Sequence, residues 1–514
     1  MRPETLALLA ALWSVPGLAD PLFIAESVPE HVYSGGWQHF VGGGLAAFDC
    51  NGDALPELYA AGGETPAVLL RNLSRPGDII RFRDATPDSL RLTAVTGAYP
   101  LDIDSDGHLD LVVLRAGQNR VLRGGPDCRF TPWPILGANP GAQWTTAFSA
   151  TWEAGQTLPT LAFGNYVDRS DPAGPFRACD HNLLYRPTDR GYDAPLPLWP
   201  GYCALSMLFS DWGRHGRADL RISNDRHYYV DDGQEQLWAM ETPPRLYTAH
   251  EGWQRHSLWG MGIASRDLTG DGLPDVFLTS MGDQRLQILA GPDQPRYRDV
   301  PFAMGTTAHR PYLGGDGRPS TGWHVGFGDV QNDGRDDIFV AKGNVEQMPD
   351  SAMADPNNLL IQQPDGRFVE RGGAAGLASL HRGRGAVLAD LNADGLLDVA
   401  VVNRRAPLQV WRNLTPGPGN WISLLPGQPA PNVNAVGARI ELQIDDRIIA
   451  REITVGGGHA GGSAGPQHFG LGDAQRVRAR IIWPNGAVSD WVALTANSRL
   501  RLQRDGSGLH VAPY

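Results

Sequence analysis

The stretch Asp102 to Asp110, with the sequence DIDSDGHLD, places oxygen-bearing groups at every second position. The carboxylates of Asp102, Asp104, Asp106 and Asp110 and the main-chain carbonyl of His108 suit a hard cation. Ca²⁺ takes about six to eight oxygen ligands at about 2.3–2.6 Å. A helical calcium loop needs glutamate at its twelfth position, where this chain has Val113. We therefore expect a shorter calcium-binding turn that leads into a β-strand.

Four further stretches repeat this frame. Three keep a full ligand set, with a main-chain carbonyl at the seventh position: Asp267, Thr269, Asp271, Leu273 and Asp275; Asp329, Gln331, Asp333, Arg335 and Asp337; and Asp390, Asn392, Asp394, Leu396 and Asp398. Their third positions are neutral, which should lower affinity relative to Asp104. A weaker fifth stretch has alanine in place of the turn glycine and ends on glutamate: Asp49, Asn51, Asp53, Leu55 and Glu57. We expect Ca²⁺ as the cofactor at four sites, with the fifth as a weaker candidate.

These acidic loops recur at regular intervals along the chain. Each is followed by a short apolar run, such as LVVL, VFLTS, IFVA or VAVV, and two degenerate copies begin at Trp152 and Asp211. With these copies included, seven equivalent points are separated by 50 to 62 residues. Short strands repeating at such a period predict an all-β fold with a seven-bladed β-propeller. Unrelated acidic turns are the alternative, but five spaced copies with matching strands argue against them.

The loops resemble the FG-GAP/VCBS repeats of integrin α-chain propellers. The end of the chain resembles the ASPIC/UnbV domain of the cartilage acidic protein family, through NWISL (Asn420–Leu424), AVGARIEL (Ala435–Leu442), HFGLG (His468–Gly472) and IIWPNG (Ile481–Gly486). The resemblance identifies the chain as an exported, bacterial-type member of that family. It implies a propeller over residues 20–414 and a small all-β domain over 420–505, separated by the hinge Thr415–Gly419. These motifs are specific for fold and say little about activity.

The resemblance also implies where a ligand would bind. In such propellers the metal loop joins the inner strand of a blade to the next strand, so the far ends of these strands meet at the opposite face. The candidates there are Asn224, Asp225, His227, Tyr228, Tyr229, Trp259, His324, Lys342, Asn344, Arg384 and Asn403. Aromatic rings and hydrogen-bonding groups together are typical of a concave ligand site. The alternatives are packing of Trp259 between blades, a structural His324, and a plain surface loop at Asn224–Tyr229.

Other stretches carry less specific predictions. WQHFVGGGLAAFD, from Trp37 to Asp49, is interpreted as an inner strand, and residues 165–205 as an insertion rich in turns. The segment Gly456–Pro466 has too many glycines for a strand, which predicts a mobile loop or a turn lined by backbone. His459 and His468 lack a second ligand at metal spacing and are expected to be structural.

The N-terminus predicts export. Residues 1–19 contain one arginine, an apolar middle and small residues before Asp20, which is the pattern of a cleaved signal peptide; a retained anchor is the alternative. No later segment is long and apolar enough to cross a membrane. We expect a periplasmic or extracellular protein, where four cysteines can form two disulfides. We favour Cys179 with Cys203, since both lie in one turn-rich stretch, and leave Cys50 and Cys128 open, with four buried thiols as the alternative.

Composition limits the classes of function. The chain of 514 residues has a formal charge of −12, which argues against nucleic acid as a partner and is explained by the acidic loops. No nucleophile elbow, zinc signature or phosphate-binding glycine loop is present. We therefore predict a module that binds an unknown protein or glycan. The alternative is a periplasmic or secreted enzyme whose active site lies on the axial face and uses His227, Tyr228, His324 or Lys342. A purely structural role is a third hypothesis.

Overall fold

The computed structural model describes residues 19–137, 141–172, 174, 177–189, 191–226, 230–307 and 316–514. Within these ranges the chain is built from strands, and its helical segments are single 3₁₀ turns: η1 (Trp37–His39), η2 (Pro126–Cys128), η3 (Ala249–Glu251) and η4 (Phe302–Met304). The prediction of an all-β protein is therefore confirmed. Residues 1–18 of the predicted signal peptide and the candidates His227, Tyr228 and Tyr229 lie outside the described residues. No helix in the described ranges has the length and apolar character needed to cross a bilayer.

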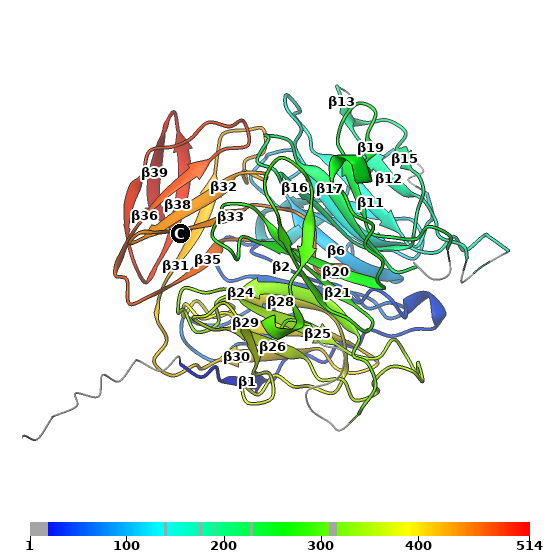
Figure 1. Ribbon diagram of the computed structural model, residues 1–514, viewed down its shortest axis with the longest axis horizontal. Coiled ribbons are helices and arrows are strands. Elements are labelled where there is room, and N and C mark those ends of the chain that lie inside the picture. The colour runs from blue at the N-terminus through cyan, green and yellow to red at the C-terminus, as the bar shows by residue number, and fades with distance from the viewer. Residues whose placement is uncertain are drawn as a thin grey trace, which may run out of the picture.

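Seven sheets follow one another along residues 23–413, and each contains four antiparallel strands from this part of the chain (Figure 1). The first three contain β2 (Leu45–Phe48), β3 (Glu57–Ala60), β4 (Val68–Asn72) and β5 (Phe82–Asp84); β6 (Val95–Leu101), β7 (Asp110–Arg115), β8 (Arg120–Gly125) and β9 (Arg129–Pro132); and β10 (Thr145–Thr151), β11 (Thr160–Asn165), β12 (Asn182–Tyr185) and β15 (Leu196–Leu198). A separate hairpin joins β13 (Pro187–Thr188) to β14 (Gly191–Tyr192).

The remaining four sheets have the same strand order. They contain β16 (Ala204–Ser210), β17 (Asp219–Asn224), β18 (Gln236–Ala239) and β19 (Arg245–Leu246); β20 (Gly260–Arg266), β21 (Asp275–Ser280), β22 (Arg285–Leu289) and β23 (Tyr297–Asp299); β24 (Gly322–Gly328), β25 (Asp337–Lys342), β26 (Asn358–Gln362) and β27 (Phe368–Glu370); and β28 (Arg382–Ala389), β29 (Asp398–Arg404), β30 (Gln409–Asn413) and β1 (Phe23–Glu26).

The second strand of each sheet is buried on both faces because neighbouring sheets pack on either side of it. In β7, for example, Leu111 to Leu114 are all inaccessible to solvent. This burial explains why most of these strands are continuous apolar runs rather than alternating ones; β17 is an exception, with Arg221 and Ser223 among its buried residues. It also explains why each run could be recognised directly after its acidic loop.

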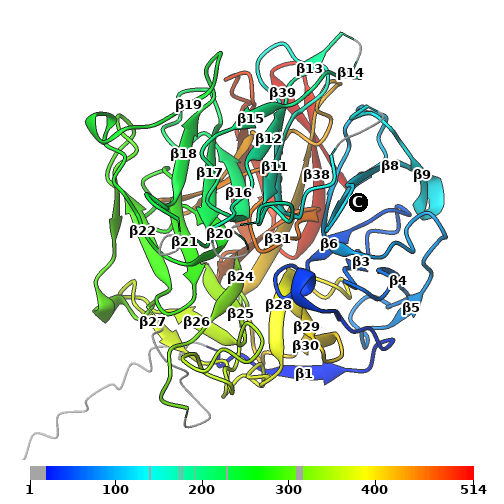
Figure 2. The same cartoon turned by 90° about the vertical axis from the view of Figure 1, so that its right-hand side faces the viewer.

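The two ends of this region meet in one sheet. β1, from the start of the described chain, pairs antiparallel with β30, so the last sheet combines N-terminal and C-terminal strands. The first strands of successive sheets contact one another, and β28 in turn contacts β2. Figure 2 shows the sheets spread around a common centre, with the C-terminal strands behind them.

The C-terminal domain consists of two four-stranded sheets and lies to one side of the other sheets in Figure 1. One contains β31 (Asn420–Gly427), β35 (Gln467–Gly472), β38 (Ser498–Asp505) and β39 (Gly508–Pro513); the other contains β32 (Arg439–Ile444), β33 (Arg447–Glu452), β36 (Arg476–Ile482) and β37 (Val492–Thr495). Apolar side chains from both sheets form one core, which includes Ile422, Ile440, Phe469 and Ile481. The C-terminal part of the chain is therefore built from strands, as the small all-β domain expected there requires.

The glycine-rich segment Val455–Ala464 enters the centre of the seven sheets. Its backbone bonds to several first strands: Ala98 N to Ala460 O (3.2 Å), Ala150 N to Val455 O (3.2 Å), Gly457 N to Met207 O (2.7 Å) and Gly458 N to Ile263 O (2.7 Å). It ends in β34 (Ser463–Ala464), which pairs parallel with β2. The prediction of a mobile loop is wrong, whereas the alternative of a backbone-lined turn is closer. Glycine is required at two positions because the first strands come so close: a Cβ atom at Gly456 would lie 2.7 Å from Met207 O, and one at Gly461 would lie 2.3 Å from Leu45 O.

Two other local predictions are corrected. Trp37–His39 form the η1 turn, and β2 begins only at Leu45, because the glycines at 42–44 interrupt the expected strand. Residues 165–205 are not simply an insertion, since β12 and β15 complete the third sheet from within them. The predicted disulfide Cys179–Cys203 is confirmed, and Cys50 pairs with Cys128.

Candidate functional site

Each of the five acidic loops joins the first and second strands of one sheet. In the best of them, between β6 and β7, Asp102 accepts hydrogen bonds from Asp106 N (3.2 Å) and Gly107 N (2.8 Å). At the other end of the loop Asp110 accepts from Ile103 N (2.8 Å) and Gly124 N (2.8 Å). The first and last carboxylates thus hold the turn in shape and fix the positions of the intervening oxygens.

Carboxylates concentrate in this loop. Carboxylate oxygens of Asp102, Asp104 and Asp106 lie within 4.8 Å of one another. Among the five loops, as far as the structure describes them, this is the one in which three carboxylates come so close. Burial raises the pKa of Asp102 to about 6 and that of Asp110 to about 7, and neighbouring carboxylates add to both shifts. The Arg123 guanidinium contacts Asp104 (2.6 Å) and Asp106 (3.1 Å) and compensates part of this charge.

Oxygens at the third position of three loops are buried without a partner. Oδ1 of Asp104, Oε1 of Gln331 and Oδ1 of Asn392 accept no hydrogen bond from any described residue. A buried acceptor without a donor is costly, and its usual explanation is an ion or water at the site. The three atoms occupy the same position of the repeat, which is a position predicted to ligate metal. The donor set therefore fits a hard, oxygen-seeking cation.

The weaker loop of the first sheet has a different environment. Glu57 lies beside the Cys50–Cys128 disulfide and accepts a hydrogen bond from Cys50 N (3.1 Å), and burial raises its pKa to about 7. Asn51 Nδ2 donates to Asp53 (3.0 Å). Hydrogen bonds within the loop therefore occupy several of its oxygens.

In the two degenerate copies of the loop, side chains of the protein bind the carboxylates. In the fourth sheet, Asp219 accepts from Trp212 Nε1 (2.9 Å) and Tyr247 Oη (2.7 Å) and pairs with Arg217 (2.9 Å). In the third sheet, Glu153 pairs with Arg186 (2.8 Å). Side-chain donors satisfy these acids, so neither copy presents the unpartnered oxygen found at Asp104.

A cavity of about 340 Å³, the aromatic cavity, lies at the strand ends opposite the acidic loops. Its aromatic walls are Trp37, Phe40, Tyr166, Trp259 and Trp323, and its charged residues are Asp225, Arg226, Glu346, Arg404 and Arg405. Of the eleven predicted ligand residues, Asp225 and Trp259 line it. The structure thus brings these two predicted positions together in one cavity, and a ligand-binding role for them stays a prediction.

Six other predicted ligand residues do not line the aromatic cavity. Each is buried and has a partner within the protein: Asn224 Nδ2 with Gln234 O (2.8 Å), His324 Nδ1 with His459 N (3.1 Å), Lys342 Nζ with Asp355 (3.0 Å), Asn344 Nδ2 with Met348 O (3.0 Å), Arg384 Nη2 with Val345 O (2.6 Å) and Asn403 Nδ2 with Pro407 O (2.8 Å). Lys342 is the chain's single lysine. These groups hold strand ends together, since buried polar atoms must be paired.

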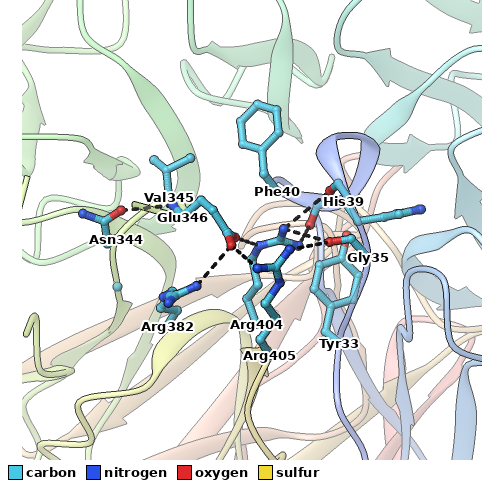
Figure 3. Close-up of polar contacts among 12 residues, drawn as sticks. Tyr33, Gly35, His39, Phe40, Asn344, Val345, Glu346, Arg382, Arg404 and Arg405 are labelled. Carbon is cyan, nitrogen blue, oxygen red and sulfur yellow. Dashed lines mark hydrogen bonds and ion pairs between the residues drawn. The ribbon is translucent and has the colours of Figure 1, made fainter. Parts of the chain in front are cut away.

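Four arginines surround the cavity floor, and three of them converge on Glu346 (Figure 3). Its carboxylate pairs with Arg404 (2.5 Å), Arg405 (2.5 Å) and Arg382 (3.5 Å). Burial alone would raise the pKa of Glu346, but the hydrogen bond from Arg404 and the three guanidinium charges outweigh it and lower the pKa. The fourth, Arg384, stacks 3.9 Å from the centroid of Trp323.

Several lining residues were missed from the sequence. Trp37 and Phe40 belong to η1 and the residue after it, a stretch interpreted as a strand, and Glu346 and Arg405 follow strand ends by one or more residues. The sequence contained one usable signal for Glu346 and Arg405, because both follow the second strand of a sheet at the predicted face. Nothing local distinguished Trp37, since its place depends on packing against Trp144, with ring centroids 4.9 Å apart.

Comparison with known proteins agrees with the C-terminal assignment. Residues 428–508 match the family model described as ASPIC and UnbV. The chain is 25% identical over 528 aligned residues to mouse (Mus musculus) cartilage acidic protein 1, covering 94% of this chain and 77% of that protein. It is 26% identical over 238 residues to human (Homo sapiens) cartilage acidic protein 1, covering 45% of this chain and 33% of that protein. The chain thus carries an ASPIC/UnbV-type domain and is similar to these proteins beyond it.

Solved structures add little. The BBS1N chain of a complex with ARL6DN aligns with a TM-score of 0.42 and 10% identity over 78% of this chain and 97% of that chain. An Agrocybe aegerita lectin specific for non-reducing terminal N-acetylglucosamine aligns with a TM-score of 0.32 and 15% identity over 78% and 91%. Both scores lie below 0.5, so neither alignment supports a functional argument.

Proposed function

We propose that this protein is an exported, calcium-stabilised β-propeller of seven FG-GAP/VCBS-type blades with a C-terminal ASPIC/UnbV-like domain, acting as a binding or adhesion module for a protein or a glycan. The seven consecutive sheets, the pairing of β1 with β30 and the contact between β28 and β2 support the blade count. The similarity to cartilage acidic protein 1 supports the family.

The unpartnered third-position oxygens of Asp104, Gln331 and Asn392 carry the calcium assignment. The Asp102–Asp110 loop would hold the ion through three clustered carboxylates, and the ion's charge would offset their repulsion. Bound calcium would join the two strands at the root of a blade. Its role here is structural, because it links backbone turns rather than facing the aromatic cavity.

Thermal unfolding with and without the metal tests this assignment. A ligand that binds only the native state stabilises it by about 2.7 kcal/mol at a concentration of 100 Kd per site. Calcium should therefore raise the melting temperature (Tm), and chelation should lower it. The variant Asp104→Asn should lose part of the calcium-dependent increase, whereas Asp365→Asn, in an exposed turn outside the loops, should keep all of it. A calcium response that is equal in both variants would refute the ligand role of Asp104.

The two disulfides support export, because such bonds persist in oxidising compartments. Binding is favoured over catalysis by one observation in the aromatic cavity. Its two acids, Asp225 and Glu346, are both paired with arginine (Asp225 with Arg226, 3.4 Å), which removes them as general bases. A glycan array and a pull-down in calcium test the binding role. The absence of any retained partner in both would overturn it.

A further inference from the structure

We infer that the aromatic cavity binds a small carboxylate with an aromatic or aliphatic body. This site is distinct from the calcium loops and does not depend on the proposed macromolecular partner. The inference rests on the shape, lining and charge of the cavity.

The cavity has the size and preorganisation of a small-molecule site. Its volume of about 340 Å³ falls within the range typical of ligand pockets. The rings of its wall support one another in tilted and edge-to-face pairs, with centroids 6.1 Å apart for Trp37 and Phe40 and 5.8 Å apart for Phe40 and Tyr166. Tyr166 and Trp323 are inaccessible to solvent, whereas Trp37 is 46% exposed. An apolar ligand would therefore meet Trp37 at the solvent side, and the buried rings of Tyr166 and Trp323 would support the wall from behind.

The charge of the cavity favours an anion. Three arginines, Arg226, Arg404 and Arg405, line it together with two carboxylates, Asp225 and Glu346, in a chain whose formal charge is −12. Glu64 bonds to Gly36 N (2.8 Å) but is not part of the lining. A cationic ligand would meet like charges, while an anion would complement the excess of guanidinium groups.

Two further arginines strengthen this excess from just behind the wall. Arg382 contacts Glu346, so that single carboxylate is shared among three guanidinium groups. Arg384 donates to the carbonyl oxygens of Phe40 (3.2 Å), Gly383 (2.9 Å) and Val345 (2.6 Å) and stacks on Trp323. Carbonyl groups satisfy its hydrogen bonds without cancelling its charge. Positive charge therefore lies beneath an aromatic wall of the cavity.

Arg405 is the residue best placed to take a ligand carboxylate. Its side chain is 52% exposed, and it shares Glu346 with two better-buried arginines, so its guanidinium can turn toward the cavity without leaving Glu346 unpaired. Guanidinium groups bind carboxylates through two parallel hydrogen bonds, a geometry that lysine cannot provide. Figure 3 shows Arg405 beside Arg404 below Glu346.

Calorimetric titration of the full chain with 4-phenylbutyrate tests the inference, with 4-phenylbutyramide and 4-phenylbutylamine as neutral and cationic analogues of nearly equal shape. The carboxylate should bind with an affinity at least tenfold above that of the amide, and the amine should bind most weakly. Binding should also change the intrinsic tryptophan fluorescence, because three tryptophans line the cavity. Equal affinity for the three compounds, or no binding of the carboxylate up to its solubility limit, would overturn the inference.

Two variants locate the binding site. Arg405→Gln should weaken binding of the carboxylate at least tenfold with little effect on the amide, whereas Arg298→Gln, at an exposed position of β23, should leave both unchanged. Trp37→Ala should weaken the binding of both the carboxylate and the amide, since it removes an apolar contact of the cavity wall and leaves the charges in place. Carboxylate binding that Arg405→Gln and Trp37→Ala leave unaffected would place the ligand elsewhere and refute the assignment. A failed glycan array or pull-down would bear on the proposed function alone.

Discussion

Gly97 in β6 offers a direct test of how the C-terminal domain is joined to the seven sheets. A Cβ atom at this position would lie 1.7 Å from Ala460 O and 2.7 Å from Ala460 C, within the segment Val455–Ala464. Neither strand nor segment can yield easily, because both contacts are with backbone atoms. The variant Gly97→Ala should therefore push the segment away from the second sheet.

The expected cost follows from two losses. Overpacking a close contact costs about 1–3 kcal/mol. Displacing Ala460 also breaks the hydrogen bond from Ala98 N (3.2 Å), which contributes about 1 kcal/mol. The total is about 2–4 kcal/mol. Because the unfolding entropy grows with chain length, each kcal/mol should lower the Tm of a chain this long by about 1–2 °C.

Differential scanning calorimetry and limited proteolysis measure the effect. We expect the Tm of Gly97→Ala to fall by about 2–8 °C and cleavage within the segment to become faster. Gly465→Ala is the matched control, since a Cβ there meets no atom within 4 Å. A Gly97→Ala protein with the Tm and cleavage rate of the control would show that the segment does not lie against β6.

Two further predictions concern buried charge. Burial lowers the pKa of His459 to about 4 and that of His324 to about 3, below the unfolded value of 6.5, so both contribute stability above pH 6.5 that is lost as the pH falls toward 4. Between pH 6.5 and pH 5 each histidine should lower the free energy of unfolding by about 2 kcal/mol, because the unfolded chain takes up a proton that the folded protein does not. The Tm should therefore fall less steeply over this pH range in His459→Gln than in the unchanged protein, and an equal slope would contradict this. The pair Lys342–Asp355 is fully buried, so Lys342→Met should destabilise by about 3–5 kcal/mol in urea unfolding, and adding Asp355→Leu should recover part of that loss. A double variant as unstable as the single one would exclude an uncompensated Asp355 as the cause.

Local sequence was sufficient wherever a feature repeats and depends on near neighbours. The acidic loops could be placed because Asp102 and Asp110 bond to amides a few residues away, and the strand after each loop is a continuous apolar run buried on both faces. The disulfide Cys179–Cys203 could be favoured because it closes a short turn-rich stretch. The C-terminal all-β domain followed from the family motifs.

Tertiary structure decided whatever depends on residues far apart in the chain. The aromatic cavity assembles Trp37, Tyr166, Trp259 and Arg405 from distant segments, and no local pattern tells a lining residue from a buried tether such as Lys342. The segment Val455–Ala464 has the composition of a loose loop, yet it is held in place because its bare backbone bonds to first strands more than 180 residues away. The sequence by itself therefore determined the repeating unit and the spacing of the oxygen-bearing side chains in its loops. Only packing around a common centre decided which side chains meet there, because that depends on how seven separate sheets close on one another.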